Sequence, residues 1–113
     1  MFAPIFLHIH NGREKATMEI HSDKLTPEML VEAVKKCGVI SNREFRSNEH
    51  HIREAARRLI KNAGKELRPE KDICDPMSHK TNYTCTVPFE LGEKKNVHID
   101  VFVSVPVKAV LDD

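Results

Sequence analysis

Residues 40–64 read ISNREFRSNEHHIREAARRLIKNAG, and this stretch decides the fold. Ser41 and Glu44 have the spacing of a capping box, in which each side chain satisfies a backbone N–H left free at a helix start. Asn48 interrupts the apolar stripe of this predicted helix, so the first turns of the helix are expected to be less buried than the rest. Gly64 is a typical residue at the end of a helix. The stripe follows the spacings of one helix face and comprises Phe45, Ile52, Ala55, Ala56, Leu59, Ile60 and Ala63.

The outer face of this predicted helix is basic. At about 100° per residue, its cations fall away from the apolar stripe: Arg43, Arg46, Arg53, Arg57, Arg58 and Lys61. Most such faces are solvated and carry local ion pairs, here Glu49 with Arg53 and Glu54 with Arg58. The alternative is a docking stripe for an acidic protein surface or a polyanion.

Length and composition predict a single domain over residues 1–113. With 40% hydrophobic and 31% charged residues, the chain has the composition of an ordinary globular protein. A net charge of +1 argues against a general nucleic-acid coat. No apolar run approaches the roughly 20 residues of a membrane span, and no basic secretory leader is visible. We therefore expect a cytoplasmic protein that does not bind membranes.

The cysteines support the same compartment. Cys37, Cys74 and Cys85 are odd in number and share no Cys-x-x-Cys spacing, which predicts free thiols in a reducing environment. Cys37 and Cys85 fall on apolar faces and are interpreted as small core residues.

Alternating apolar residues predict a hairpin at each end of the chain. At the first, the dipeptide Asn11-Gly12 favours a two-residue turn, which pairs His8 with Lys15 and Phe6 with Thr17. One face then carries Ala3, Ile5, Leu7, Ile9, Ala16, Met18 and Ile20. The opposite face carries Phe2, Phe6, His8, His10, Lys15 and His21.

The second hairpin covers residues 83–107. A turn over residues 93–95 would place Val87 opposite Val101 and Phe89 opposite Ile99, with Phe102 pointing outward. Pro88 predicts an edge strand, because proline cannot donate to a sheet ladder.

Between the hairpins, residues 27–37 predict a shorter helix. Thr26 is its cap, Pro27 occupies the first helical position, and Gly38 follows its last turn. Residues 65–80 show no regular pattern and are expected to form a loop. The chain is therefore predicted to be α+β, with the order ββααββ and a four-stranded antiparallel sheet that carries two helices packed on one face.

Two clusters contain residue types that are found in reactive sites. His8 and His10 share a face that His21 and His98 can join, which is a weak pattern for zinc. Loop residues of acid, thiol and imidazole type are the second cluster: Asp72, Cys74, Asp75 and His79. Neither pattern fixes the geometry that a metal or a nucleophile needs. No metal, cofactor or catalytic residue is therefore predicted.

The leading hypothesis is a non-enzymatic interaction protein, of the adaptor or inhibitor type, that binds another protein or a second copy of itself. It would use an exposed aromatic and histidine sheet face together with the basic helix. These partner-binding candidates are Arg46, Arg53, Arg57, Arg58, Lys61, Phe6, Phe102, His8 and His10. The alternative is a nucleic-acid-binding module that uses the basic helix, and a small metal- or thiol-dependent enzyme ranks third.

Overall fold

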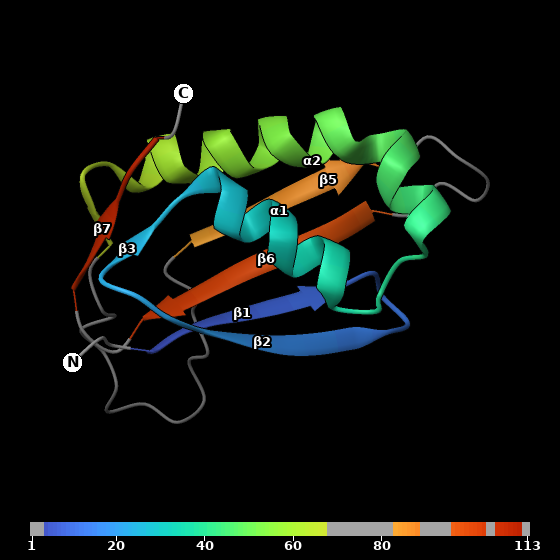
Figure 1. The fold of residues 1–113 in the computed structure, drawn as a ribbon, viewed down its shortest axis with the longest axis horizontal. Helices are drawn as coiled ribbons and strands as arrows, with labels where there is room; N and C mark the ends of the chain where they lie inside the picture. The colour runs from blue at the N-terminus through green and yellow to red at the C-terminus, as the bar shows by residue number, and fades with distance from the viewer. Residues whose placement is uncertain (1–3, 68–82, 89–95, 104–105, 112–113) are drawn as a thin grey trace.

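The computed structural model describes residues 4–67, 83–88, 96–103 and 106–111. The α+β class predicted from the sequence is confirmed, and Figure 1 shows the arrangement. In chain order the elements are β1 (Pro4–His10), β2 (Lys15–His21), β3 (Lys24–Leu25), α1 (Pro27–Lys36), α2 (Asn42–Ala63), β4 (Glu66–Leu67), β5 (Tyr83–Pro88), β6 (Asn96–Val103) and β7 (Val107–Ala109).

The strands form two sheets. The larger sheet has the order β2-β1-β6-β5, and each neighbouring pair is antiparallel. Strand β5 lies at its edge, as Pro88 predicted. The smaller sheet has the order β3-β7-β4. It was not predicted, because strands of two or three residues are too short to show an alternating pattern. The expected continuation of β6 to Val107 is wrong, since β7 follows Pro106 and pairs in the smaller sheet.

The first hairpin has a longer turn than predicted. His8 pairs with Thr17 and not with Lys15. The side chain of Asn11 explains the shift, because its Oδ1 accepts hydrogen bonds from the backbone N–H groups of Arg13 and Glu14, at 3.0 and 2.8 Å. These bonds stabilise a four-residue loop. The register moves by two residues, so every side chain keeps its predicted face.

The second hairpin is also shifted. Val87 pairs with Val97, where the sequence predicted Val101. The predicted turn and the pairing of Phe89 lie outside the described residues. Since β5 ends at Pro88 and β6 begins at Asn96, the connection is longer than a tight turn, and turn chemistry could not fix the register.

The two helices begin where their capping residues predict. The Oγ1 of Thr26 accepts a hydrogen bond from the backbone N–H of Met29 at 3.4 Å. Ser41 and Glu44 form the complete capping box, with both hydrogen bonds at 3.1 Å. The expectation that Asn48 weakens burial of the first turns is wrong. Its side chain is buried, and its Nδ2 donates to the carbonyl of Glu44 at 2.9 Å, which satisfies the polar group inside the core.

The core lies between the larger sheet and both helices, which cover the same side of it (Figure 1). Sheet residues on this side are completely buried: Ile5, Leu7, Ile9, Val97, Ile99 and Val101. Helix residues that complete the core include Leu30, Val34, Ile52, Leu59 and Ile60. We call this side of the sheet the inner face and the opposite side the open face.

Candidate binding surfaces

The open face gathers aromatic, imidazole and carboxylate side chains from two neighbouring strands. Phe6 of β1 lies directly opposite Phe102 of β6, and His10 lies directly opposite His98. Between them, His8 of β1 lies opposite Asp100. Because side chains alternate between the two faces along each strand, three side chains of β1 lie on the open face beside three side chains of β6. Strand β2 adds Lys15 and Thr17 beside His10 and His8.

These side chains contact one another. The ring of His8 lies 4.7 Å from that of Phe102 and is tilted by 56° to it. The rings of His10 and His98 are stacked at 4.9 Å. His10 also places Nε2 at 3.3 Å from an Oδ2 of Asp100, whose side chain is only 18% exposed. The side chains of β1 and β6 thus hold one another in place on the open face.

The predicted exposed aromatic patch is more closed than expected. Phe6 and Phe102 are half-buried, because they face each other across neighbouring strands and His8 packs on Phe102. Among the described residues, Leu111 is the one large apolar side chain classed as exposed. The open face therefore presents a mixed aromatic and polar surface. Phe2, also placed on this face by the sequence, lies outside the described residues.

A hollow of about 600 Å³ lies at the β2 side of the open face. Its lining combines three basic or imidazole groups, a hydroxyl and a carboxylate. The residues are His8, His10, Lys15, Ala16, Thr17 and Asp100. Its volume lies within the range of about 300–1,000 Å³ that is usual for ligand pockets.

Thr17 and Asp100 line the hollow but were not named as candidates from the sequence. Strand alternation could have identified Asp100, because Phe102 was predicted to point outward and a residue two positions earlier on the same strand shares its face. Thr17 joins His8 only in the observed register, which the sequence did not give.

The second candidate surface is the outer face of α2. All of its predicted cations are exposed, namely Arg43, Arg46, Arg53, Arg57, Arg58 and Lys61. Within the described residues, Arg43, Arg46, Arg58 and Lys61 form no ion pair. The predicted pair of Glu54 with Arg58 is thus not observed.

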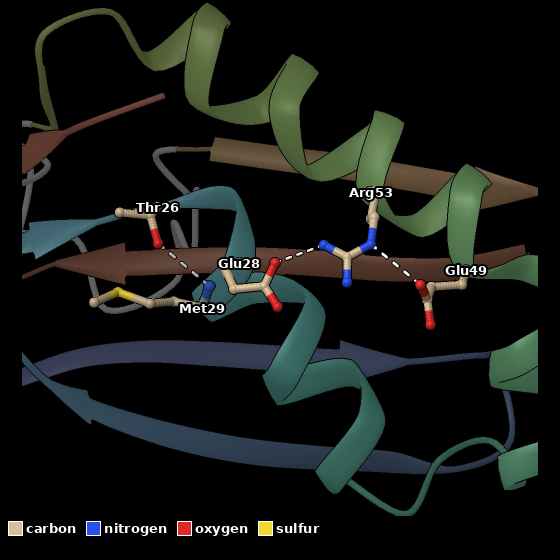
Figure 2. A network of polar contacts seen from close by, with 5 residues as sticks. All are labelled: Thr26, Glu28, Met29, Glu49 and Arg53. Carbon is tan, nitrogen blue, oxygen red and sulfur yellow. Dashed lines mark hydrogen bonds and ion pairs between the residues drawn. The ribbon is translucent and has the colours of Figure 1, made fainter. Parts of the chain in front are cut away.

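Arg53 differs from its neighbours because it links the two helices. Its NH1 group bonds to Glu28 of α1, and its Nε donates to Glu49 at 3.3 Å (Figure 2). Two hydrogen bonds raise the pKa of the Arg53 guanidinium above its usual range: the bond to Glu28 has the larger effect and the bond to Glu49 the smaller. Arg53 therefore serves first to hold α2 against the start of α1, and it is a weaker candidate for partner binding than Arg43, Arg46, Arg58 and Lys61.

The two surfaces lie on opposite sides of the molecule. The helices cover the inner face of the larger sheet (Figure 1). The basic residues of α2 are exposed and lie outside its buried stripe, whereas the paired histidines and phenylalanines of β1 and β6 belong to the open face. A small partner would therefore contact one of these surfaces and not both, and the expectation that either of them binds a partner stays a prediction. Each must be considered as a separate site.

The reactive clusters receive no support from the part of the chain that the structure describes. No three His, Cys, Asp or Glu side chains in it are placed to hold a metal ion. Cys37 is half-buried, and burial raises the pKa of its thiol, which makes it a poor nucleophile. The loop cluster of Asp72, Cys74, Asp75 and His79 lies outside the described residues. No described helix is long and apolar enough to cross a membrane.

The chain matches no family model, no curated protein and no solved structure.

Proposed function

We propose that the protein is a non-enzymatic cytoplasmic interaction module, of the adaptor or inhibitor type, that binds another protein through the open face of its larger sheet. The observation that carries this proposal is the cluster of rings and charges on that face. The tilted ring of His8 packs against Phe102, and His10 contacts both His98 and Asp100, beside a hollow of about 600 Å³.

The physical argument rests on preorganisation. Side chains that are already packed against one another lose little conformational freedom when a partner binds, so less of the contact energy is spent on ordering them. Aromatic groups with a polar rim are also typical of the centre of protein interfaces. Both features favour the open face over the α2 surface as the protein-binding site.

The test compares one variant on each side of the molecule. His8→Ala removes an exposed ring from the open face, and Arg58→Ala removes an exposed cation from α2. Each tagged variant and the wild type would be used to capture partners from the source cell, with nuclease present, followed by quantitative mass spectrometry. We expect one protein to be retained by the wild type and by Arg58→Ala, and to be depleted with His8→Ala. Equal recovery with both variants would contradict the proposal.

A second candidate function rests on a different observation. Arg43, Arg46, Arg58 and Lys61 are exposed without a carboxylate partner among the described residues, and α2 spreads them over about 27 Å. This arrangement supports a nucleic-acid contact through phosphates. Its signature would be an affinity that falls steeply with salt and is weakened by Arg58→Ala but not by His8→Ala. Failure to bind DNA or RNA at low ionic strength would exclude it.

A further inference from the structure

Among the described residues, the outer edge of β2 is an edge of the larger sheet that no other strand pairs with. Strand β2 pairs with β1 at every position from Lys15 to His21 without a bulge, and no described strand pairs with its other side. It contains no proline. The opposite edge of the sheet differs, because β5 ends in Pro88 and α2 packs beside it. Proteins usually block a sheet edge with proline, a bulge, charged side chains or a covering element, and an unblocked edge is a template for another strand. Of these devices β2 carries only charged side chains, Lys15 and Glu19, so a strand that pairs there must match their charges.

The hydrogen-bonding groups on this edge can be assigned from the hairpin turn. The backbone N–H of Asn11 donates to the carbonyl of Glu14 at 3.1 Å, so these two residues form a hydrogen-bonded pair. Pairs in an antiparallel ladder alternate between hydrogen-bonded and non-hydrogen-bonded. Lys15, Thr17 and Glu19 therefore belong to non-hydrogen-bonded pairs with β1. Their N–H and C=O groups point away from β1 and are available to a further strand.

The side chains of these same residues are self-complementary. If a second copy lies antiparallel with Thr17 on the two-fold axis, Lys15 lies opposite the partner's Glu19, and Glu19 lies opposite the partner's Lys15. Thr17 then lies opposite the partner's Thr17. Opposite charges and threonine pairs at directly opposed positions both stabilise antiparallel strands. The half-buried inner-face residues match as well, with Ala16 opposite the partner's Met18.

Charge selects this register over its neighbour. With Met18 on the axis, the same backbone groups could still pair, but Lys15 would lie opposite the partner's His21 and Glu19 opposite the partner's Thr17. No pair of opposite charges would then be formed. The register centred on Thr17 provides two such pairs, one at each end of the contact.

We infer that two copies of this chain pair through their β2 edges, antiparallel and centred on Thr17, so that the larger sheet continues across a two-fold axis. This dimer would place the two open faces side by side, because Lys15 and Thr17 line the hollow on that face. Edge pairing alone buries a small area, so the dimer is expected to be weak and concentration-dependent. The inference does not rest on the proposed function, since it concerns the strand edge and not the rings.

The test uses two charge reversals that are each unfavourable alone and complementary together. In Lys15→Glu, two carboxylates face each other at both ends of the contact. In Glu19→Lys, two ammonium groups do so. Each change replaces two attractive pairs with two repulsive ones, so we expect each variant to dimerise about tenfold more weakly than the wild type. An equimolar mixture of the two variants restores opposite charges at both ends and should form a heterodimer of nearly wild-type affinity.

Sedimentation equilibrium over a concentration series measures all four samples. Arg58→Glu on α2 is the control matched to Lys15→Glu, because it makes the same change in net charge on the opposite side of the molecule and should leave the wild-type mass curve unchanged. Circular dichroism confirms that each variant is folded. A wild type that stays monomeric at every concentration would overturn the inference. So would a dimer that ignores both reversals, or a mixture that does not associate.

Discussion

The two faces of the larger sheet come from alternate residues of the same strands, yet they are held in different ways. On the inner face, Leu7 and Ile99 are completely buried beneath the helices. On the open face, His8 and Asp100 are held by neighbouring rings and charges and remain accessible to a partner. The difference teaches that an alternating pattern decides which face becomes core, whereas the chemistry of the other face depends on which residues the register brings together.

The sharpest test of this contrast uses two consecutive residues of β1. Leu7→Ala should lower the free energy of unfolding by about 2–5 kcal/mol, because it removes buried methyl groups and leaves a cavity under the helices. His8→Ala, on the open face, should change it by no more than about 0.5 kcal/mol. Urea denaturation followed by circular dichroism measures both. Similar losses for the two variants would mean that the open face is covered in the folded chain.

Local signals in the sequence were sufficient to predict which residues form the inner face and where helix α2, which covers it, begins and ends. Ser41 with Glu44 fixed the start of α2, and Gly64 its end, because these residues act within one helical turn. Alternation placed Leu7 and Phe102 on their correct faces, since an even shift in register does not change the face.

Features that depend on contacts between distant residues could not be predicted. The side chain of Asn11 decides the turn, and with it whether His8 meets Lys15 or Thr17. The bond between Arg53 and Glu28 joins residues 25 positions apart on different helices, which no periodicity reveals. The smaller sheet could not be predicted either, because β3 and β4 pair with β7 through contacts between residues that are distant in the sequence.

The helical cover of the inner face provides a second, smaller test. Arg53→Met keeps the apolar part of the side chain but removes the bonds to Glu28 and Glu49. We expect a loss of up to about 1 kcal/mol in the free energy of unfolding, because the pairs are solvent-exposed and partly screened. Arg58→Met, a matched change without an ion pair, should be neutral within about 0.5 kcal/mol.

The salt dependence of the free energy of unfolding distinguishes the loss of these ion pairs from a loss of packing. The difference between Arg53→Met and Arg58→Met should shrink as the ionic strength of the urea titration rises, because screening weakens exposed pairs. A difference that is unchanged at high salt would show that the stem of Arg53, and not its charge, holds the helices together.

The smallest expected effect concerns Cys37, at the end of α1 and against the rim of the core. Burial raises the pKa of its thiol above the ordinary value of 9.0, because the thiolate is less well solvated in the folded chain. A group with a raised folded-state pKa contributes stability that is fully present below its unfolded pKa and is lost as the pH rises through the folded value. The free energy of unfolding of the wild type should therefore fall more than that of Cys37→Ala as the pH rises above about 9. Alkylation supplies an independent measurement, since the peptide that contains Cys37 should react with iodoacetamide more slowly in the folded chain than in urea. Parallel pH curves for the two proteins, together with equal alkylation rates, would place this thiol in solvent and outside the core that covers the inner face.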